Sequence, residues 1–150
     1  MRMRLGTVAF LLLMACTPRG EIPGLRLGGT LAEVPADFSF SFEYEEILLE
    51  ARGAVLPRVV RIWCVASGEK LYVAGDPDRG WMRRVAQRPD VRVRIGDNAY
   101  ELRAVEVTDA GELEWVLSAY TEKYSAQLVA LFGRPATVED LGFVYRLAQR

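Results

Sequence analysis

Short runs of alternating apolar and polar residues, separated by tight turns, constrain this fold more than any other feature of the chain. The alternation covers residues 38–45, 91–95 and 143–147, residues 59–65 are apolar almost throughout, and residues 70–74 form the other arm of a hairpin with them. A two-residue period is typical of a β-strand with one buried face, and a short continuous apolar run suits a strand buried on both faces. The turns at 67–69 and 96–98 are short enough to join antiparallel neighbours. The sequence therefore predicts a sheet built of hairpins.

Two helices are expected among these strands. Asp76-Pro77 is a typical helix start, and Pro89 should end that helix. Asp109 and Glu112 have the spacing of a capping box, and the apolar residues after them recur every three or four positions up to Gly133. The expected fold is thus mainly β with flanking helices (α+β): a small antiparallel barrel with one short helix between hairpins and one longer helix before the last strand.

Composition limits the kinds of chemistry open to the chain. A length of 150 residues, with 51% hydrophobic and 26% charged residues, suits one globular domain. The chain has no histidine, which excludes Ser-His-Asp and Cys-His catalysis and zinc sites that need imidazole. Cys64 lies in an apolar run and is expected to be a small core residue rather than a nucleophile. The formal net charge of −1 gives no reason to expect nucleic acid as a partner.

The N-terminus has the layout of a secretory signal. Arg2 and Arg4 precede the apolar run 8–14, which ends at Ala15 and Cys16 and is too short for an ordinary transmembrane helix. The tetrad Leu13-Met14-Ala15-Cys16 resembles the lipobox of bacterial lipoproteins, in which the cysteine is lipidated and becomes the first residue. The resemblance implies a cleaved signal peptide over 1–15 and a lipid anchor on Cys16. The alternative is an apolar N-terminal helix with an incidental cysteine.

These features predict both a location and a domain boundary. A lipid on Cys16 would hold the protein in the cell envelope, on the extracytoplasmic side of a bacterial membrane. Cleavage would remove Arg2 and Arg4 and change the net charge from −1 to −3. Residues 16–36 are rich in glycine and proline and have no sustained period, so we expect a flexible spacer there. The barrel domain is expected over 37–150.

The order of motifs over residues 47–147 resembles the flavin and deazaflavin (FMN-binding) split-barrel superfamily, and above all its deazaflavin-dependent nitroreductase-like branch. The resemblance rests on Glu50-Ala51-Arg52-Gly53, Pro57-Arg58, Gly75-Asp76-Pro77-Asp78-Arg79-Gly80-Trp81 and Arg88-Pro89-Asp90-Val91. It implies a split β-barrel, FMN or a deazaflavin as cofactor, oxidoreductase activity on a small molecule, and a homodimer. Such a cofactor would carry the redox chemistry, and the protein would bind and orient it.

The same resemblance implies a set of binding residues. In that family, basic residues on the loop after the first barrel strand and at the start of the first helix hold the phosphate end of the cofactor. Arg52, Arg58 and Arg79 fill those places here, and Arg84 and Trp81 lie on the same helix as Arg79. Guanidinium groups match phosphate oxygens, and an indole can lie along a flat ring. The family's loop commonly carries Lys-Ser-Gly after its arginine, whereas this chain has Gly53-Ala54-Val55.

Two functions therefore remain open. The first is a membrane-anchored lipoprotein whose barrel binds a flavin-like or other planar anionic ligand and transfers hydride or electrons to a small acceptor. The second is a non-enzymatic binding or scaffold lipoprotein with a cofactor-free barrel. A groove between Arg58, Arg79 and Trp81 would favour the first function. A filled interior, with those residues splayed apart, would favour the second.

Overall fold

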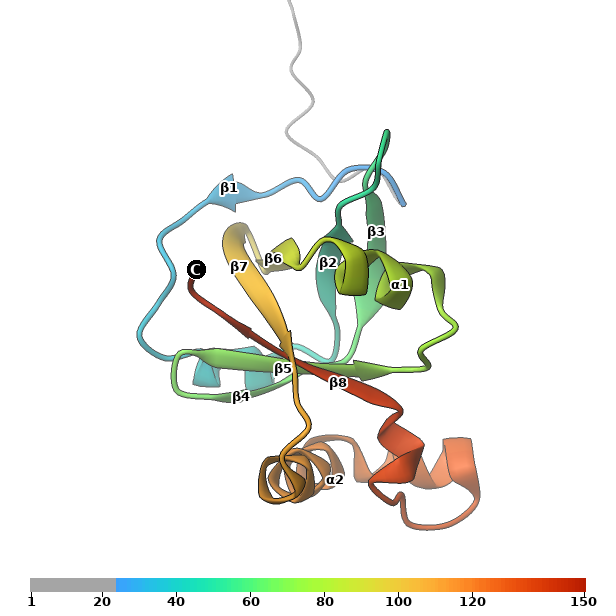
Figure 1. Ribbon diagram of the computed structural model, residues 1–150. Helices are drawn as coiled ribbons and strands as arrows, with labels where there is room; N and C mark the ends of the chain where they lie inside the picture. Colours follow the sequence, from blue (N-terminus) through green and yellow to red (C-terminus); the bar gives the residue numbers. More distant parts are fainter. Residues whose placement is uncertain (1–23) are drawn as a thin grey trace, which may run out of the picture.

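The computed structural model describes residues 24–150, and its main element is one curled β-sheet (Figure 1). The strands are β1 (Thr30–Leu31), β2 (Ile47–Ala51), β3 (Arg58–Ile62), β4 (Val65–Ser67), β5 (Lys70–Gly75), β6 (Asp90–Ile95), β7 (Asn98–Glu106) and β8 (Phe143–Ala148). The helices are α1 (Gly80–Gln87) and α2 (Ala110–Phe132), and two 3-10 turns are η1 (Ser39–Glu43) and η2 (Glu139–Leu141). The sheet order is β3-β2-β6-β7-β8-β5-β4, with β1 paired to β7.

The predicted fold class is confirmed. All strand pairs are antiparallel except β1 with β7, and the sheet curls into a split barrel. Helix α1 lies between β5 and β6, and α2 precedes β8, as the sequence predicts. Figure 1 shows α2 packed below β5 and β8, at the end of the molecule away from β3.

Two large apolar clusters and a small third one, formed by Leu27, Leu48, Val59 and Ala99, hold these elements together. The first fills the barrel interior, where Leu49, Val91, Val93 and Leu102 are fully buried. The alternate residues of β6 point outward, and Arg92 forms a two-pronged ion pair with Glu50. The second cluster joins α2 to the outer face of the sheet. The barrel is therefore closed by its own side chains, and any ligand must bind outside this interior.

The strand predicted over residues 38–45 is wrong. Its middle forms η1, because Asp37 accepts hydrogen bonds from both the backbone amide and the hydroxyl of Ser39, each at 2.9 Å. Phe38 is completely buried while Phe42 is 61% exposed, so the alternating phenylalanines do not share one buried face. Local capping by aspartate and serine has overridden the two-residue pattern.

The helix boundaries were predicted with mixed success. Helix α1 begins at Gly80 rather than at Asp76, because the Asp76 carboxylate accepts the amide of Asp78 and forms a turn ahead of the helix. Its end before Pro89 is confirmed. The Asp109 cap on α2 is confirmed by a 2.8 Å hydrogen bond from the Glu112 amide.

Residues 24–36 correct the predicted spacer. Leu27 is only 1% exposed, and the Thr30 amide donates to the Asp97 carbonyl oxygen at 2.8 Å, where β1 extends the sheet. This part of the chain is therefore packed on the barrel, and the folded body begins before residue 37. The signal peptide over 1–15, the lipidated Cys16 and the rest of the spacer lie outside the described residues. Within residues 24–150, no helix is long and apolar enough to cross a membrane.

Candidate functional site

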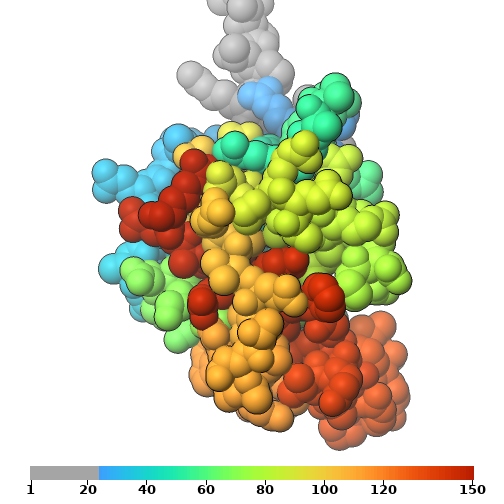
Figure 2. Space-filling model, viewed as in Figure 1, coloured from blue at the N-terminus to red at the C-terminus, as the bar shows by residue number. Residues whose placement is uncertain are grey.

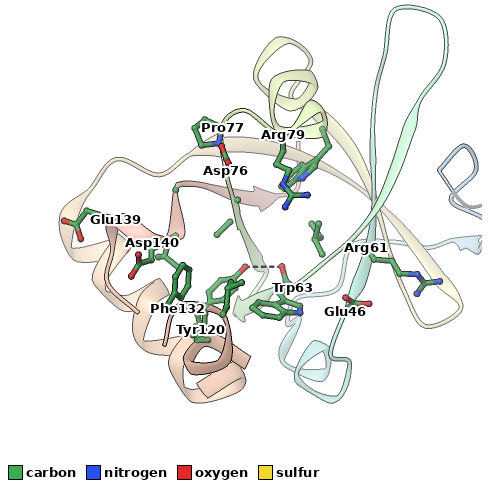
Figure 3. Close-up of a pocket in the computed structure, with 18 residues that line it drawn as sticks. Glu46, Arg61, Trp63, Asp76, Pro77, Arg79, Tyr120, Phe132, Glu139 and Asp140 are labelled. Carbon is green, nitrogen blue, oxygen red and sulfur yellow. Dashed lines mark hydrogen bonds between the residues drawn. The ribbon is translucent and has the colours of Figure 1, made fainter. Parts of the chain in front are cut away.

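A cavity of about 810 Å³ lies between the sheet and the C-terminal half of α2 (Figure 3). Its walls come from four places: the end of β3 with Trp63, the end of β5 with the turn before α1, the last turns of α2, and η2 with Gly142. These segments are far apart in sequence. The hairpin β4-β5 and the antiparallel pairing of β5 with β8 bring them together.

Aromatic side chains form the floor of this cavity. The half-buried Trp63 ring stacks on Tyr124 with ring centroids 4.8 Å apart and planes 13° apart. The Tyr120 hydroxyl donates to the Trp63 carbonyl oxygen at 3.1 Å, which ties the floor to α2. Phe132 adds a further ring at the end of the helix. Such walls suit a flat apolar ligand surface.

A cation enters the cavity from the opposite rim. Arg79 precedes the first turn of α1, and its side chain reaches into the cavity toward Trp63 (Figure 3). Within residues 24–150 this side chain makes no hydrogen bond or salt bridge. As the N-cap residue it also leaves the first amides of α1 without a side-chain cap. A guanidinium beside free helical amides favours an anionic group at this rim.

Carboxylates line other parts of the rim, and most have protein partners. Asp140 accepts two hydrogen bonds from Arg134, at 2.7 and 3.0 Å, and these hold the pKa of Asp140 well below its usual range. Asp76 caps its own turn, and Glu46 lies with Arg61 at the far edge (Figure 3). Of the two arginines among the described residues that line the cavity, Arg61 and Arg79, it is Arg79 whose side chain points into it (Figure 3).

The structure separates the predicted binding residues into two groups. Arg79 and Trp81 both line the cavity, although Trp81 is 8% exposed and acts as a packed wall rather than a free ring. Arg52, Arg58 and Arg84 do not line it. They surround the β2-β3 loop instead, where Arg84 Nη1 donates to the Leu56 carbonyl oxygen at 2.8 Å. The sequence could not show this, because both loops carry arginines and only barrel closure decides which loop faces α2.

Sequence reasoning also missed part of the site. Trp63 lies in the apolar run 59–65, for which a buried strand was expected, and it lines the cavity while resting on Tyr124. Phe132 and η2 were not expected near a ligand. The three- and four-residue spacing had already placed Tyr120 on one face of α2, but it gave no information about what that face contacts.

The polar groups outside the cavity support the fold. Glu112 accepts hydrogen bonds from Arg146 at 2.7 Å and from the Tyr72 hydroxyl at 2.8 Å, which fastens α2 to β5 and β8. Burial, and then the hydrogen bond to Glu112, raises the pKa of Tyr72 to about 12. Burial also raises the pKa of the Cys64 thiol, as expected of a core cysteine. The described residues include no cluster of three or more His, Cys, Asp or Glu side chains that could hold a metal ion.

Solved structures share this architecture. An F420-H2 dependent reductase (FDR-A) is 18% identical, with a TM-score of 0.54 over 80% of this chain and 99% of that one. HutZ, the heme storage protein from Vibrio cholerae, is 19% identical, with a TM-score of 0.59 over 74% and 85%. A FAD-binding protein from Mesorhizobium loti is 16% identical, with a TM-score of 0.54 over 74% and 86%. These likenesses establish the split-barrel fold.

Sequence comparison identifies the family more directly. No curated protein matches the chain with significant similarity. A family model described as an uncharacterized protein conserved in bacteria (DUF2255) matches residues 43–138. This range runs from the end of η1 through both helices and includes Trp63, Arg79 and Phe132. Because the match covers more than half of the sequence, the chain belongs to the DUF2255 family.

Proposed function

We propose that this protein binds a small planar ligand that carries an acidic group, in the cavity between the barrel and α2. One observation carries the proposal: the side chain of Arg79 enters an aromatic-walled cavity without a partner among the described residues. A flat ring would lie against Trp63, and its acidic group would meet Arg79 and the first amides of α1. A volume of about 810 Å³ is within the usual range for such sites.

A flavin or a deazaflavin fits part of this arrangement. Two structural neighbours are an F420-H2 dependent reductase and a FAD-binding protein, and a third is a heme storage protein, whose ligand is also flat and acidic. Arg79 and the start of α1 would hold the acidic end, and Trp63 would support the ring. A bound flavin would supply hydride or electron transfer, and oxidoreductase activity is proposed on that basis. The protein's own part would be to position the ligand.

The scaffold function remains the second candidate, and one observation favours it. The barrel interior is filled by buried side chains, and Arg58 lies away from Arg79 and Trp81. In that case the cavity would be a surface hollow without a physiological ligand. A homodimer stays a proposal under either function; it is supported by one solved neighbour described as a domain-swapped dimer, with 19% identity and a TM-score of 0.54.

Lipid anchoring is also a proposal. It rests on the lipobox-like tetrad that ends at Cys16. Mass spectrometry of the mature protein would test it. We expect a first residue Cys16 that carries lipid, whereas an unmodified N-terminus would refute both the anchor and the envelope location.

Ligand binding can be tested directly. The purified full chain would be titrated with FMN, F420 and heme while absorbance and thermal unfolding are followed. We expect saturable binding of at least one of the three. Arg79→Ala should weaken it about tenfold or more, because a charge-assisted hydrogen bond is lost. Arg88→Ala, at the other end of the same helix and outside the cavity, should leave it unchanged. Absence of binding to all three would favour the scaffold.

A further inference from the structure

The tip of the β2-β3 loop exposes two large apolar side chains. Val55 is 88% exposed and Leu56 is 60% exposed, and the nearby Leu25 is 51% exposed. The loop is held in a defined shape, because Arg84 Nη1 binds the Leu56 carbonyl oxygen. A Cβ added at Gly53 would collide with both of these atoms. The exposed tip is therefore a built feature of the fold, not an unstructured turn.

Arginines surround this tip without compensating acids. Residues 51–58 and 83–88 hold five of the chain's 19 basic residues and no aspartate or glutamate, whereas the rest of the chain has 14 basic and 20 acidic residues. Helix α1 lies beside the loop, as the Arg84 hydrogen bond shows. Within the described part of the chain, the exposed side chains of Arg52 and Arg58 make no hydrogen bond or salt bridge. This end of the protein is strongly basic although the whole chain is slightly acidic.

The described chain also begins at this end. The Val59 amide donates to the Gly24 carbonyl oxygen at 3.0 Å, which places Gly24 against β3. In Figures 1 and 2 the loop projects at the top, beside the first described residues and away from α2. Gly24 is only eight positions after Cys16, a reach of about 28 Å when fully extended. A lipid on Cys16 would keep a bilayer within that distance of Gly24, at the end of the molecule where the tip projects.

We propose that this surface, formed by Leu25, Arg52, Val55, Leu56 and Arg58, docks on an anionic lipid bilayer. Val55 and Leu56 enter the interfacial region, and the arginines contact the headgroup phosphates. Apolar side chains framed by cations are the usual basis of such binding, because burial and attraction to anionic lipid add together. The proposal goes beyond the ligand site and does not depend on whether the cavity is filled.

The test places a probe at the tip. In a Cys16→Ser full chain, Val55→Cys would be labelled with an environment-sensitive dye, because Cys64 is completely buried. The matched control is Val129→Cys, 50% exposed on α2 at the opposite end. Both chains carry the same N-terminal segment, so its contribution to total vesicle binding is the same for both, and the arginine variants below distinguish insertion of the tip from tethering through that segment. With vesicles of phosphatidylcholine and phosphatidylglycerol, we expect a blue shift at position 55 and none at 129. Equal shifts, or none, would overturn the proposal.

Charge provides a second arm of the test. Arg52→Gln with Arg58→Gln should weaken vesicle binding of the labelled tip about fivefold for each arginine, and phosphatidylcholine alone should bind it poorly. Lys70→Gln, on the β4-β5 hairpin, should have no effect. A blue shift that grows with protein concentration in the absence of vesicles would show that the surface binds a second copy of the protein, and it would overturn the proposal. Arg79→Ala should leave the blue shift of the labelled tip unchanged while it weakens binding of the planar ligand. The two proposals can therefore fail separately.

Discussion

The hydroxyl of Tyr124 lies at the centre of the contact between α2 and the barrel. It is within hydrogen-bond distance of the Glu45 carbonyl oxygen at 2.8 Å and of the Cys64 carbonyl oxygen at 3.0 Å, and it accepts the Cys64 amide at 3.1 Å. The side chain is 1% exposed, and its ring supports Trp63 in the cavity floor. Removing this oxygen should therefore loosen the helix that forms one wall of the site.

Tyr124→Phe keeps the ring stack and deletes only the hydroxyl. A hydroxyl has one proton, so it donates to one carbonyl oxygen at a time while it accepts the Cys64 amide. The variant leaves this amide without a partner, and an unsatisfied buried group costs about 1–3 kcal/mol. We expect the free energy of unfolding to fall by about 2 kcal/mol. With a typical urea dependence for a domain of this size, the midpoint of urea unfolding should fall by about 1 M.

Tyr44→Phe is the matched control, because Tyr44 is 39% exposed and its hydroxyl makes no hydrogen bond with a described residue. The free energy of unfolding of this variant should differ from that of the unmodified protein by no more than about 0.5 kcal/mol. If Tyr124→Phe lowered the midpoint no more than Tyr44→Phe does, the hydroxyl would not fasten α2, and the reasoning would be refuted. Ligand affinity, measured on the same two variants, should follow the same order.

Three further variants test other parts of the fold. Arg92→Met should lower the free energy of unfolding by about 2–3 kcal/mol, because it leaves the buried Glu50 carboxylate, 6% exposed, without its ion pair. In thermal unfolding, the double variant with Glu50→Met should recover most of this loss. Gly142→Ala should be more destabilising in urea than Gly133→Ala: both have a positive φ, but only at Gly142 would a Cβ lie 2.5 Å from a carbonyl oxygen. The pKa of the Tyr72 hydroxyl is about 12 in the folded state and about 10 in the unfolded state. The stabilisation that its protonated form provides is therefore present below pH 10 and is lost as the pH rises to 12. Tyr72→Phe should make unfolding less dependent on pH in that window; an unchanged slope would contradict this assignment.

Period and turn chemistry were enough to predict most of the sheet. Val91, Val93 and Ile95 lie inside the barrel and the arginines between them lie outside, as strict alternation requires. The same rule failed over residues 38–45, where the Asp37 carboxylate offered local hydrogen bonds to Ser39 and no partner strand lay alongside. Alternation identifies a strand only where a neighbouring strand can satisfy the backbone.

The candidate site was harder to predict because its residues come from distant segments. Arg79 and Trp81 are two positions apart and reach the cavity together, so a local motif could identify them. Trp63 and Phe132 meet only because the β4-β5 hairpin and α2 fold onto the same face of the sheet. The arginines of the β2-β3 loop were grouped with Arg79 by resemblance, and the three-dimensional path of the barrel separates them.

Helix α1 links the two surfaces that these proposals concern. Its first residues border the cavity, where Arg79 enters, and Arg84, in its second turn, holds the β2-β3 loop. The helix is only about 12 Å long, and Trp81, Met82 and Val85 anchor it in the barrel core. Cavity and loop are therefore held in a fixed relation by one packed element. A protein docked through Val55 and Leu56 would turn α2 away from the bilayer, so a ligand would reach the cavity from the aqueous side.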